Sequence, residues 1–269
     1  MMNKKLPVLY LHGGPGMNSF GEEKILGPLF PTDSFQVEFW NEPGFSGASA
    51  YSKLVESARE SLLRLWRSQG PVKVIAHSFG ANTALDLATT NPEAVASLVF
   101  VAPALSLRSA LRNILKIASG DFRSTALEKS ERIETLLLDG SDRILDERMR
   151  EGLGLATQDP LLFTHYWQNQ EQMAQYFGAW VEKSAQMNLE AFFSVLQELD
   201  SMQERMRSFP ISKIPAVCIF GDSDPVVAEA EEKMHLQKLF KLITFVTYEG
   251  AGHFAHLEKP KEFVQNIVG

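Results

Sequence analysis

Short apolar runs alternate with longer amphipathic segments along the first hundred residues, and this alternation limits the possible folds more than any other feature. Each run is rich in Val, Ile, Leu or Phe and is bounded by Gly, Pro, Asn or Ser, as expected of strands buried on both faces. The four runs are residues 6–11, 35–40, 72–76 and 95–102. Apolar residues recur at helical spacing between them, over 52–69 and 79–90. Strands alternating with helices predict right-handed crossovers and a mainly parallel sheet.

The alternation stops after Pro103. From residue 105 to 210 we find helical periodicity and no convincing strand. Asp159 and Pro160 are typical of an N-cap followed by proline at the first helical position, and the helix predicted there continues as far as Trp180. Another helix is predicted over 189–202. Two strands and two helices are then predicted in the last part of the chain: 216–220 and 242–248, and 228–240 and 260–268.

Composition and charge exclude several classes of protein. With 45% hydrophobic and 22% charged residues among 269, the chain has the composition of a globular protein. A net charge of −7 provides no electrostatic footprint for nucleic acid. The single cysteine, Cys218, excludes a disulfide scaffold and a cysteine-rich zinc site. The first apolar run is too short for a signal peptide and no window approaches a membrane span, so a cytoplasmic location is expected.

A serine lies between a predicted strand and a predicted helix, in the string Ala76-His77-Ser78-Phe79-Gly80. Small residues two positions before and two after this serine allow a sharp, strained turn that projects its Oγ above the sheet edge. Taken alone, the string favours an ordinary serine that N-caps the following helix. Its meaning therefore depends on what else lies at the same edge.

A glycine-rich turn, His12-Gly13-Gly14-Pro15-Gly16, directly follows the first predicted strand. Its glycines allow backbone N–H groups to approach a substrate oxygen, where they stabilise the negative charge of a tetrahedral intermediate. We expect the N–H groups of Gly14 and Phe79 to form such an oxyanion hole. A dinucleotide-binding turn is disfavoured because Pro15 breaks the required glycine register.

Two further loops follow predicted strands near the end of the chain, Gly221-Asp222-Ser223-Asp224-Pro225 and Gly250-Ala251-Gly252-His253-Phe254. Open parallel sheets bind ligands at the carboxyl ends of their strands. A serine nucleophile needs a base such as imidazole, and that base needs a carboxylate to hold its tautomer. Each residue alone is compatible with turn chemistry, but all of them in this order favour catalysis.

The order Ser78, Asp224, His253, with the glycine-rich turn upstream, resembles the α/β-hydrolase superfamily over nearly the whole chain. The resemblance implies a triad of these three residues, with Asp222 as the fallback acid. It also implies an α/β core over 1–104 and 211–269 and a helical cap over 105–210. The sequence begins at the first parallel strand, so we expect about six strands with helices on both faces. Asn41 departs from the family, which usually has an acidic residue there.

A serine at this position predicts an acyl-enzyme, because the dehalogenases and epoxide hydrolases that resemble this family need an aspartate. The predicted function is a carboxylesterase-type serine hydrolase acting on a small ester or related acyl compound, without metal or organic cofactor. A proline iminopeptidase-like aminopeptidase and a C–C bond hydrolase remain alternatives. So does a slow-turnover ligand-binding receptor on the same fold. The oligomeric state is left open.

Five aromatic residues of the insertion are candidates for lining an acyl pocket: Phe163, Tyr166, Trp167, Phe177 and Trp180. At helical spacing such a set more often forms the packing core of the insertion itself, and some members can do both. Family aminopeptidases recognise the substrate amine near a Trp-Glu pair. Here Trp167 is followed by Gln168, and Trp180 by Val181, so this part of the resemblance fails.

Overall fold

The computed structural model describes residues 5–138, 141, 143–202 and 212–268. Six strands form one sheet in the order β2-β1-β3-β4-β5-β6, and every neighbouring pair is parallel. They are β1 (Leu6–Leu11), β2 (Phe35–Trp40), β3 (Val72–His77), β4 (Val95–Val101), β5 (Ala216–Gly221) and β6 (Ile243–Tyr248). The predicted parallel sheet of six strands is confirmed. The ends of the strands agree to within one residue because buried strands are continuous apolar runs.

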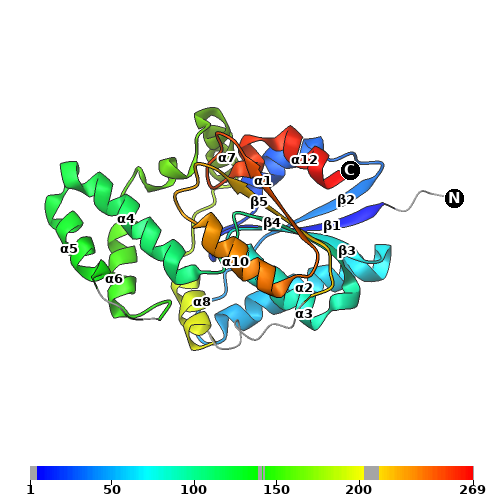
Figure 1. Cartoon of the computed structure of the whole chain (residues 1–269), viewed down its shortest axis with the longest axis horizontal. Helices are drawn as coiled ribbons and strands as arrows, with labels where there is room; N and C mark the ends of the chain where they lie inside the picture. The colour runs from blue at the N-terminus through cyan, green and yellow to red at the C-terminus, as the bar shows by residue number, and fades with distance from the viewer. Residues whose placement is uncertain (1–4, 139–140, 142, 203–211, 269) are drawn as a thin grey trace.

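Helices cover both faces of the sheet (Figure 1). One face is covered by α2 (Ala50–Gln69), α3 (Gly80–Thr90) and α10 (Glu229–Leu239). The other is covered by α1 (Phe20–Leu26), α11 (Ala255–Glu258) and α12 (Pro260–Val268). The helix α2 buries Leu54, Ala58, Leu62 and Leu65 along one stripe and ends at Gln69, with Gly70 as its C-cap. Gly70 has a φ of 94°, which glycine adopts readily. The short helices α1 and α11 were not predicted.

The direction in which strands are added to the sheet reverses between β1 and β3. The chain passes from β1 to β2 on one side and then returns to β3 on the other, so the connections after β1 and β3 leave in opposite directions. Ligands bind at such a point, outside the carboxyl ends of the strands. The turn from His12 to Gly16 follows β1, and Ser78 follows β3. The fold therefore brings these two segments to one edge.

Between β4 and β5 the described residues form helices and no strand within the insertion. These are α4 (Leu107–Thr125), α5 (Leu127–Leu137), α6 (Glu147–Ala156), the 3₁₀ turn η3 (Leu162–Tyr166), α7 (Gln170–Glu182) and α8 (Leu189–Ser201). Figure 1 shows α4, α5 and α6 at the end of the molecule opposite the N-terminus, whereas α7 contacts α1 and α8 contacts α2. The predicted boundary at residue 211 lies outside the described residues. The division into a core and a cap stays a prediction.

The prediction of a single helix from Pro160 to Trp180 is wrong. The chain instead makes the turn η3, breaks, and begins α7 at Gln170. The side chain of Asp159 accepts the N–H of Leu161 at 2.9 Å and so closes a local turn. Asn169 is the N-cap of α7, because its side-chain oxygen accepts the N–H groups of Glu171 and Gln172, each at 3.1 Å.

Among the helices in the described part of the chain, none combines the length and apolar character that crossing a membrane requires.

Candidate active site

Ser78 occupies a strained turn between β3 and α3. Its φ is 50°, in the left-handed region that costs a residue with a side chain about 1–2 kcal/mol. The backbone is held there by three hydrogen bonds: Ser78 N–H donates to the Val101 carbonyl at 2.9 Å, and the Ser78 carbonyl accepts from Ala81 and Ala104 at 3.2 and 3.1 Å. A Cβ added to Gly80 would lie 2.6 Å from the His12 carbonyl oxygen, so this position requires glycine. The small residues of the motif therefore allow α3 to approach β1.

Three side chains from different loops form one chain of hydrogen bonds. Ser78 Oγ lies 2.9 Å from His253 Nε2, and His253 Nδ1 lies 2.8 Å from Asp224 Oδ2. The His253 and Asp224 side chains are each only 3% exposed. The second carboxylate oxygen of Asp224 accepts the N–H groups of Val226 and Val227 at 2.7 and 3.3 Å. With Nδ1 donating to Asp224, Nε2 is left to accept the serine proton, which is the arrangement of a general base.

Asp222, the fallback acid, is directed elsewhere. Its side chain is exposed, and Oδ1 accepts from the N–H of Gly250 and the hydroxyl of Ser223, each at 2.9 Å. These bonds join the loops after β5 and β6. Asp222 thus has the turn chemistry that the sequence left open for both aspartates, and Asp224 is the one that contacts His253.

The glycine-rich turn packs directly against the serine. A Cβ added to Gly13 would lie 3.0 Å from Ser78 Cβ, and Gly14 lines the same pocket as Ser78 with a φ of 64°. Phe79 follows Ser78 as the N-cap residue of α3. The fold therefore brings the residues predicted to form the oxyanion hole to the serine.

Two contacts anchor this turn. Gly16 N–H donates to Glu42 Oε2 at 2.8 Å, and the Gly16 carbonyl accepts from Asn188 N–H at 2.7 Å. Burial raises the pKa of Glu42 to about 7. Asn41, the departure from the family pattern, accepts Ser19 N–H at 2.8 Å. The turn is thus held from the β2 side and from the residue that N-caps α8.

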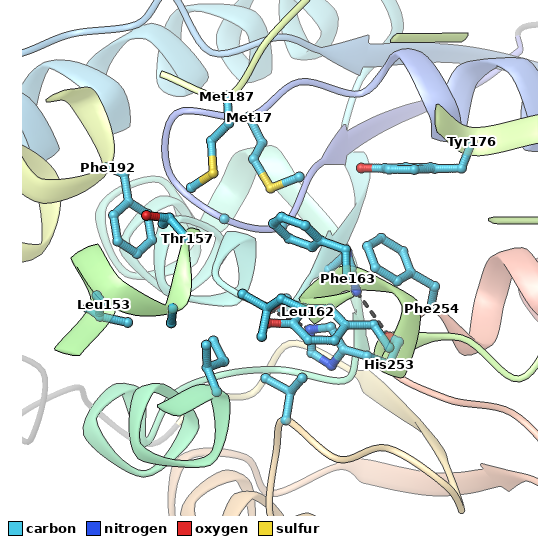
Figure 2. Close-up of a pocket in the computed structure, with 18 residues that line it drawn as sticks. Met17, Leu153, Thr157, Leu162, Phe163, Tyr176, Met187, Phe192, His253 and Phe254 are labelled. Carbon is cyan, nitrogen blue, oxygen red and sulfur yellow. Dashed lines mark hydrogen bonds between the residues drawn. The ribbon is translucent and has the colours of Figure 1, made fainter. Parts of the chain in front are cut away.

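A cavity of about 110 Å³ lies over Ser78 and His253 (Figure 2). Of the five aromatic residues predicted to line it, Phe163 and Tyr166 do so. Trp167, Phe177 and Trp180 are not among its described lining residues. Trp167 stacks on Phe254 with ring centroids 4.3 Å apart, while Phe177 and Trp180 pack against Tyr176. The set therefore divides between the pocket wall and the packing behind it.

Most of the pocket wall comes from residues that the sequence did not single out. They are apolar side chains from separate segments: Met17, Ile114, Leu153, Met187, Phe192 and Val226. Of these, Val226 alone carried a signal, since it lies two residues after the predicted acid.

In the described part of the chain, no group of three or more His, Cys, Asp or Glu side chains is arranged to hold a metal ion.

Burial shifts the pKa of three residues in the pocket wall in the direction that favours their uncharged forms. The pKa of His77 lies well below its usual value, mainly because of burial and secondly because of His256 and His253 nearby. Burial raises the pKa of both Tyr166 and Tyr176, and the negative charges of Asp224 and Glu22 add to the effect. His77 Nε2 donates to the His253 carbonyl at 3.1 Å. This histidine supports the loop of His253 as a neutral ring.

Glu22 of α1 is a fully buried carboxyl group near Tyr10 and Tyr176. Neither of its oxygens meets a hydrogen-bond partner within the described residues, and burial raises its pKa to about 8. Between about pH 4.5 and 8 the folded state holds this proton while the unfolded state has lost it. The contribution of Glu22 to stability is thus present at low pH and lost as the pH rises to about 8.

We expect Glu22→Gln to remove this loss, which amounts to about 1.4 kcal/mol per pH unit in that window. Urea unfolding of the wild type and the variant at pH 5 and pH 8 measures it, and the variant should gain free energy of unfolding over the wild type at the higher pH. The exposed neighbour Glu23 provides the matched control, Glu23→Gln. The same difference between Glu22→Gln and wild type at both pH values would contradict the prediction.

Glu258 of α11 joins the loop of His253 to the insertion. Its buried carboxylate accepts three backbone N–H groups, from Gly252, Gln168 and Asn169, each at 2.7 Å. The same two segments meet again where His253 N–H donates to the Tyr166 carbonyl at 2.8 Å. Sequence reasoning missed Glu258, because a glutamate at that position gives no sign of what its carboxylate contacts.

We expect Glu258→Gln to lower the free energy of unfolding by about 2 kcal/mol. The NH2 group of the glutamine side chain cannot accept a hydrogen bond, so at least one of the three buried N–H donors is left unpaired. Chemical denaturation measures the change. The exposed Glu262 on α12 is the control, and Glu262→Gln should change stability by less than about 0.5 kcal/mol. Equal free energies of unfolding for the two variants would show that the three hydrogen bonds of Glu258 do not stabilise the folded state.

The sheet is parallel, Ser78 lies on the turn after β3, Asp224 follows β5 and His253 follows β6. This combination is typical of the α/β-hydrolase fold. Residues 7–260 match the model of the alpha/beta hydrolase fold family, and the chain belongs to that family.

Two curated relatives match this chain over only part of their own length. The chain is 34% identical to lipase LipV of Mycobacterium tuberculosis over 90 residues, 32% of this chain and 34% of that protein. It is 24% identical to the sn-1-specific diacylglycerol lipase ABHD11 of Danio rerio over 208 residues, 74% of this chain and 56% of that protein. The matches thus span about a third and about half of these relatives. A proline iminopeptidase-related protein of Thermus thermophilus has the same fold, with a TM-score of 0.62 at 17% identity, covering 98% of this chain and 88% of that one.

Proposed function

We propose that the chain is a serine hydrolase that cleaves a small ester or related acyl compound through an acyl-enzyme. The observation that carries the proposal is the continuous hydrogen-bonded chain from Ser78 Oγ through His253 to Asp224, facing an apolar pocket. A hydroxyl group becomes a useful nucleophile when an adjacent base takes its proton and a third group orients that base.

In the proposed reaction, Ser78 Oγ attacks the substrate carbonyl carbon while His253 Nε2 takes its proton. The N–H groups of Gly14 and Phe79 hold the oxyanion of the tetrahedral intermediate. The leaving alcohol receives the proton from His253, and Ser78 retains the acyl group as an ester. Water then attacks this ester and gives its proton to His253. The second intermediate collapses to the free acid, and His253 returns the proton to Ser78.

Two observations favour an ester over the alternatives. The two relatives named above are both named as lipases, which supports an acyl ester as the substrate class. An aminopeptidase needs a carboxylate for the free amine of its substrate, and no Asp or Glu is found among the described residues that line the pocket. A slow-turnover receptor on this fold would keep the same triad, so the reactivity of Ser78 distinguishes it from an enzyme.

A fluorophosphonate probe tests the proposal, since it labels an activated serine. We expect the wild type to be labelled and Ser78→Ala not to be. Ser68, an exposed serine on α2, provides the control variant Ser68→Ala, which should be labelled like the wild type. A folded wild-type protein that resists labelling would favour the receptor instead.

A further inference from the structure

The pocket over Ser78 has no charged group to offer a substrate. Within the described residues its lining includes no Asp, Glu, Lys or Arg. Burial lowers the pKa of His77 and so keeps its ring neutral, Tyr166 and Tyr176 carry no charge near pH 7, and His253 is engaged by Asp224. Glu22, near Tyr176, is itself largely protonated there because burial raises its pKa to about 8. A charged group entering this pocket would lose its hydration and meet no counter-charge, which costs several kcal/mol.

The pocket is also small. Its volume of about 110 Å³ lies below the roughly 300–1,000 Å³ typical of ligand pockets. Each methylene buried in it should raise kcat/KM about fourfold, and further methylenes should add nothing once the pocket is full.

One wall of the pocket includes a residue that is exposed to solvent. Figure 2 shows Leu153, Thr157 and Phe192 on the opposite side of the pocket from Tyr176 and Phe254. Leu153 is buried on α6, but Thr157, one turn further along, is exposed to solvent while also lining the pocket. Thr157 therefore borders both the pocket and solvent, and a longer side chain placed there can reach an acyl group that fills the cavity.

We infer that this pocket selects a short, uncharged aliphatic acyl group, and that a charge introduced at Thr157 changes this selection. The inference rests on the proposed function and narrows it. It distinguishes this chain from an enzyme for long-chain acyl esters, and from one for acyl groups that carry a carboxylate or an amine.

The first test is a series of p-nitrophenyl esters with wild-type protein, each repeated with Ser78→Ala. We expect kcat/KM to rise more than about tenfold from acetate to butyrate and to show no further gain at octanoate. The hemisuccinate and 4-aminobutyrate esters match butyrate in chain carbons but carry opposite charges. Each should be slower than butyrate by about 100-fold or more.

Two variants at Thr157 complete the test. Thr157→Lys brings an ammonium group and Thr157→Gln is its uncharged control of similar length. The ratio of hemisuccinate to butyrate turnover should be about fivefold higher in Thr157→Lys than in Thr157→Gln, and the ratio for 4-aminobutyrate should move the opposite way. Equal ratios in the two variants would overturn the assignment of Thr157.

The outcomes separate the two claims. Serine-dependent turnover that keeps rising to octanoate, or that favours the hemisuccinate ester, overturns the inference and leaves the proposed function in place. Failure to turn over any ester, or turnover that survives Ser78→Ala, overturns the proposed function and the inference with it.

Discussion

Replacing Ser78 by alanine is expected to lower kcat for ester hydrolysis by about 10⁴-fold or more, because the members of a triad act as a unit. The bond between Ser78 Oγ and His253 Nε2 would be lost, and no acyl-enzyme could form. Steady-state hydrolysis of p-nitrophenyl butyrate measures the effect. Ser68→Ala on α2 is the control and should retain wild-type kcat. A loss of less than tenfold in Ser78→Ala would show that another group is the nucleophile.

Ser78→Gly provides a second, independent reading of the same turn. It should be as inactive as Ser78→Ala, yet more stable by about 1 kcal/mol, since glycine adopts a φ of 50° without the steric penalty of a side chain. Urea unfolding of the two variants measures the difference. Such a result would separate the strain of the turn from its chemistry.

The second large effect is expected at the acid. Asp224→Asn should lower kcat about 10³- to 10⁴-fold, because an amide in place of the carboxylate no longer holds His253 in the tautomer that accepts the serine proton. Asp222→Asn, two residues away, should cost less than about tenfold, because Asp222 contacts Gly250 and Ser223 instead. The two variants differ from the wild type by the same atoms, so each is the control for the other. The reverse order of severity would assign the acid to Asp222.

The strands and the helices that cover them were predictable because local patterns determine them. A strand buried on both faces is a continuous apolar run, and a helix such as α2 shows its buried stripe at a spacing of three and four. The break between η3 and α7 was not predictable in this way. Proline after Asp159 suits a helix start, but the Asp159 side chain closes a short turn and Asn169 begins the helix. Asp159 and Asn169 are both residue types that suit an N-cap, and the α-helix begins only after Asn169.

Candidate triad residues could be picked out because each follows a strand in a short recognisable string, and parallel strands deliver their carboxyl ends to one edge. The local strings do not separate Asp224 from Asp222, because both lie in the same turn, and only the resemblance to the family favoured Asp224. In the structure Asp224 contacts His253, whereas Asp222 contacts Gly250.

The pocket wall and the contacts of Glu258 depended entirely on the tertiary structure. Met17, Leu153 and Phe192 come from segments far apart in the chain and look like ordinary apolar residues until folding gathers them over one serine. The carboxylate of Glu258 meets two of its three donors, Gln168 and Asn169, across about ninety residues, and no local pattern indicates these contacts. Periodicity and short motifs encode elements and the ends of strands, because they arise from neighbours along the backbone. Which side chains enclose a cavity depends on contacts between distant segments, and only the packed molecule decides those.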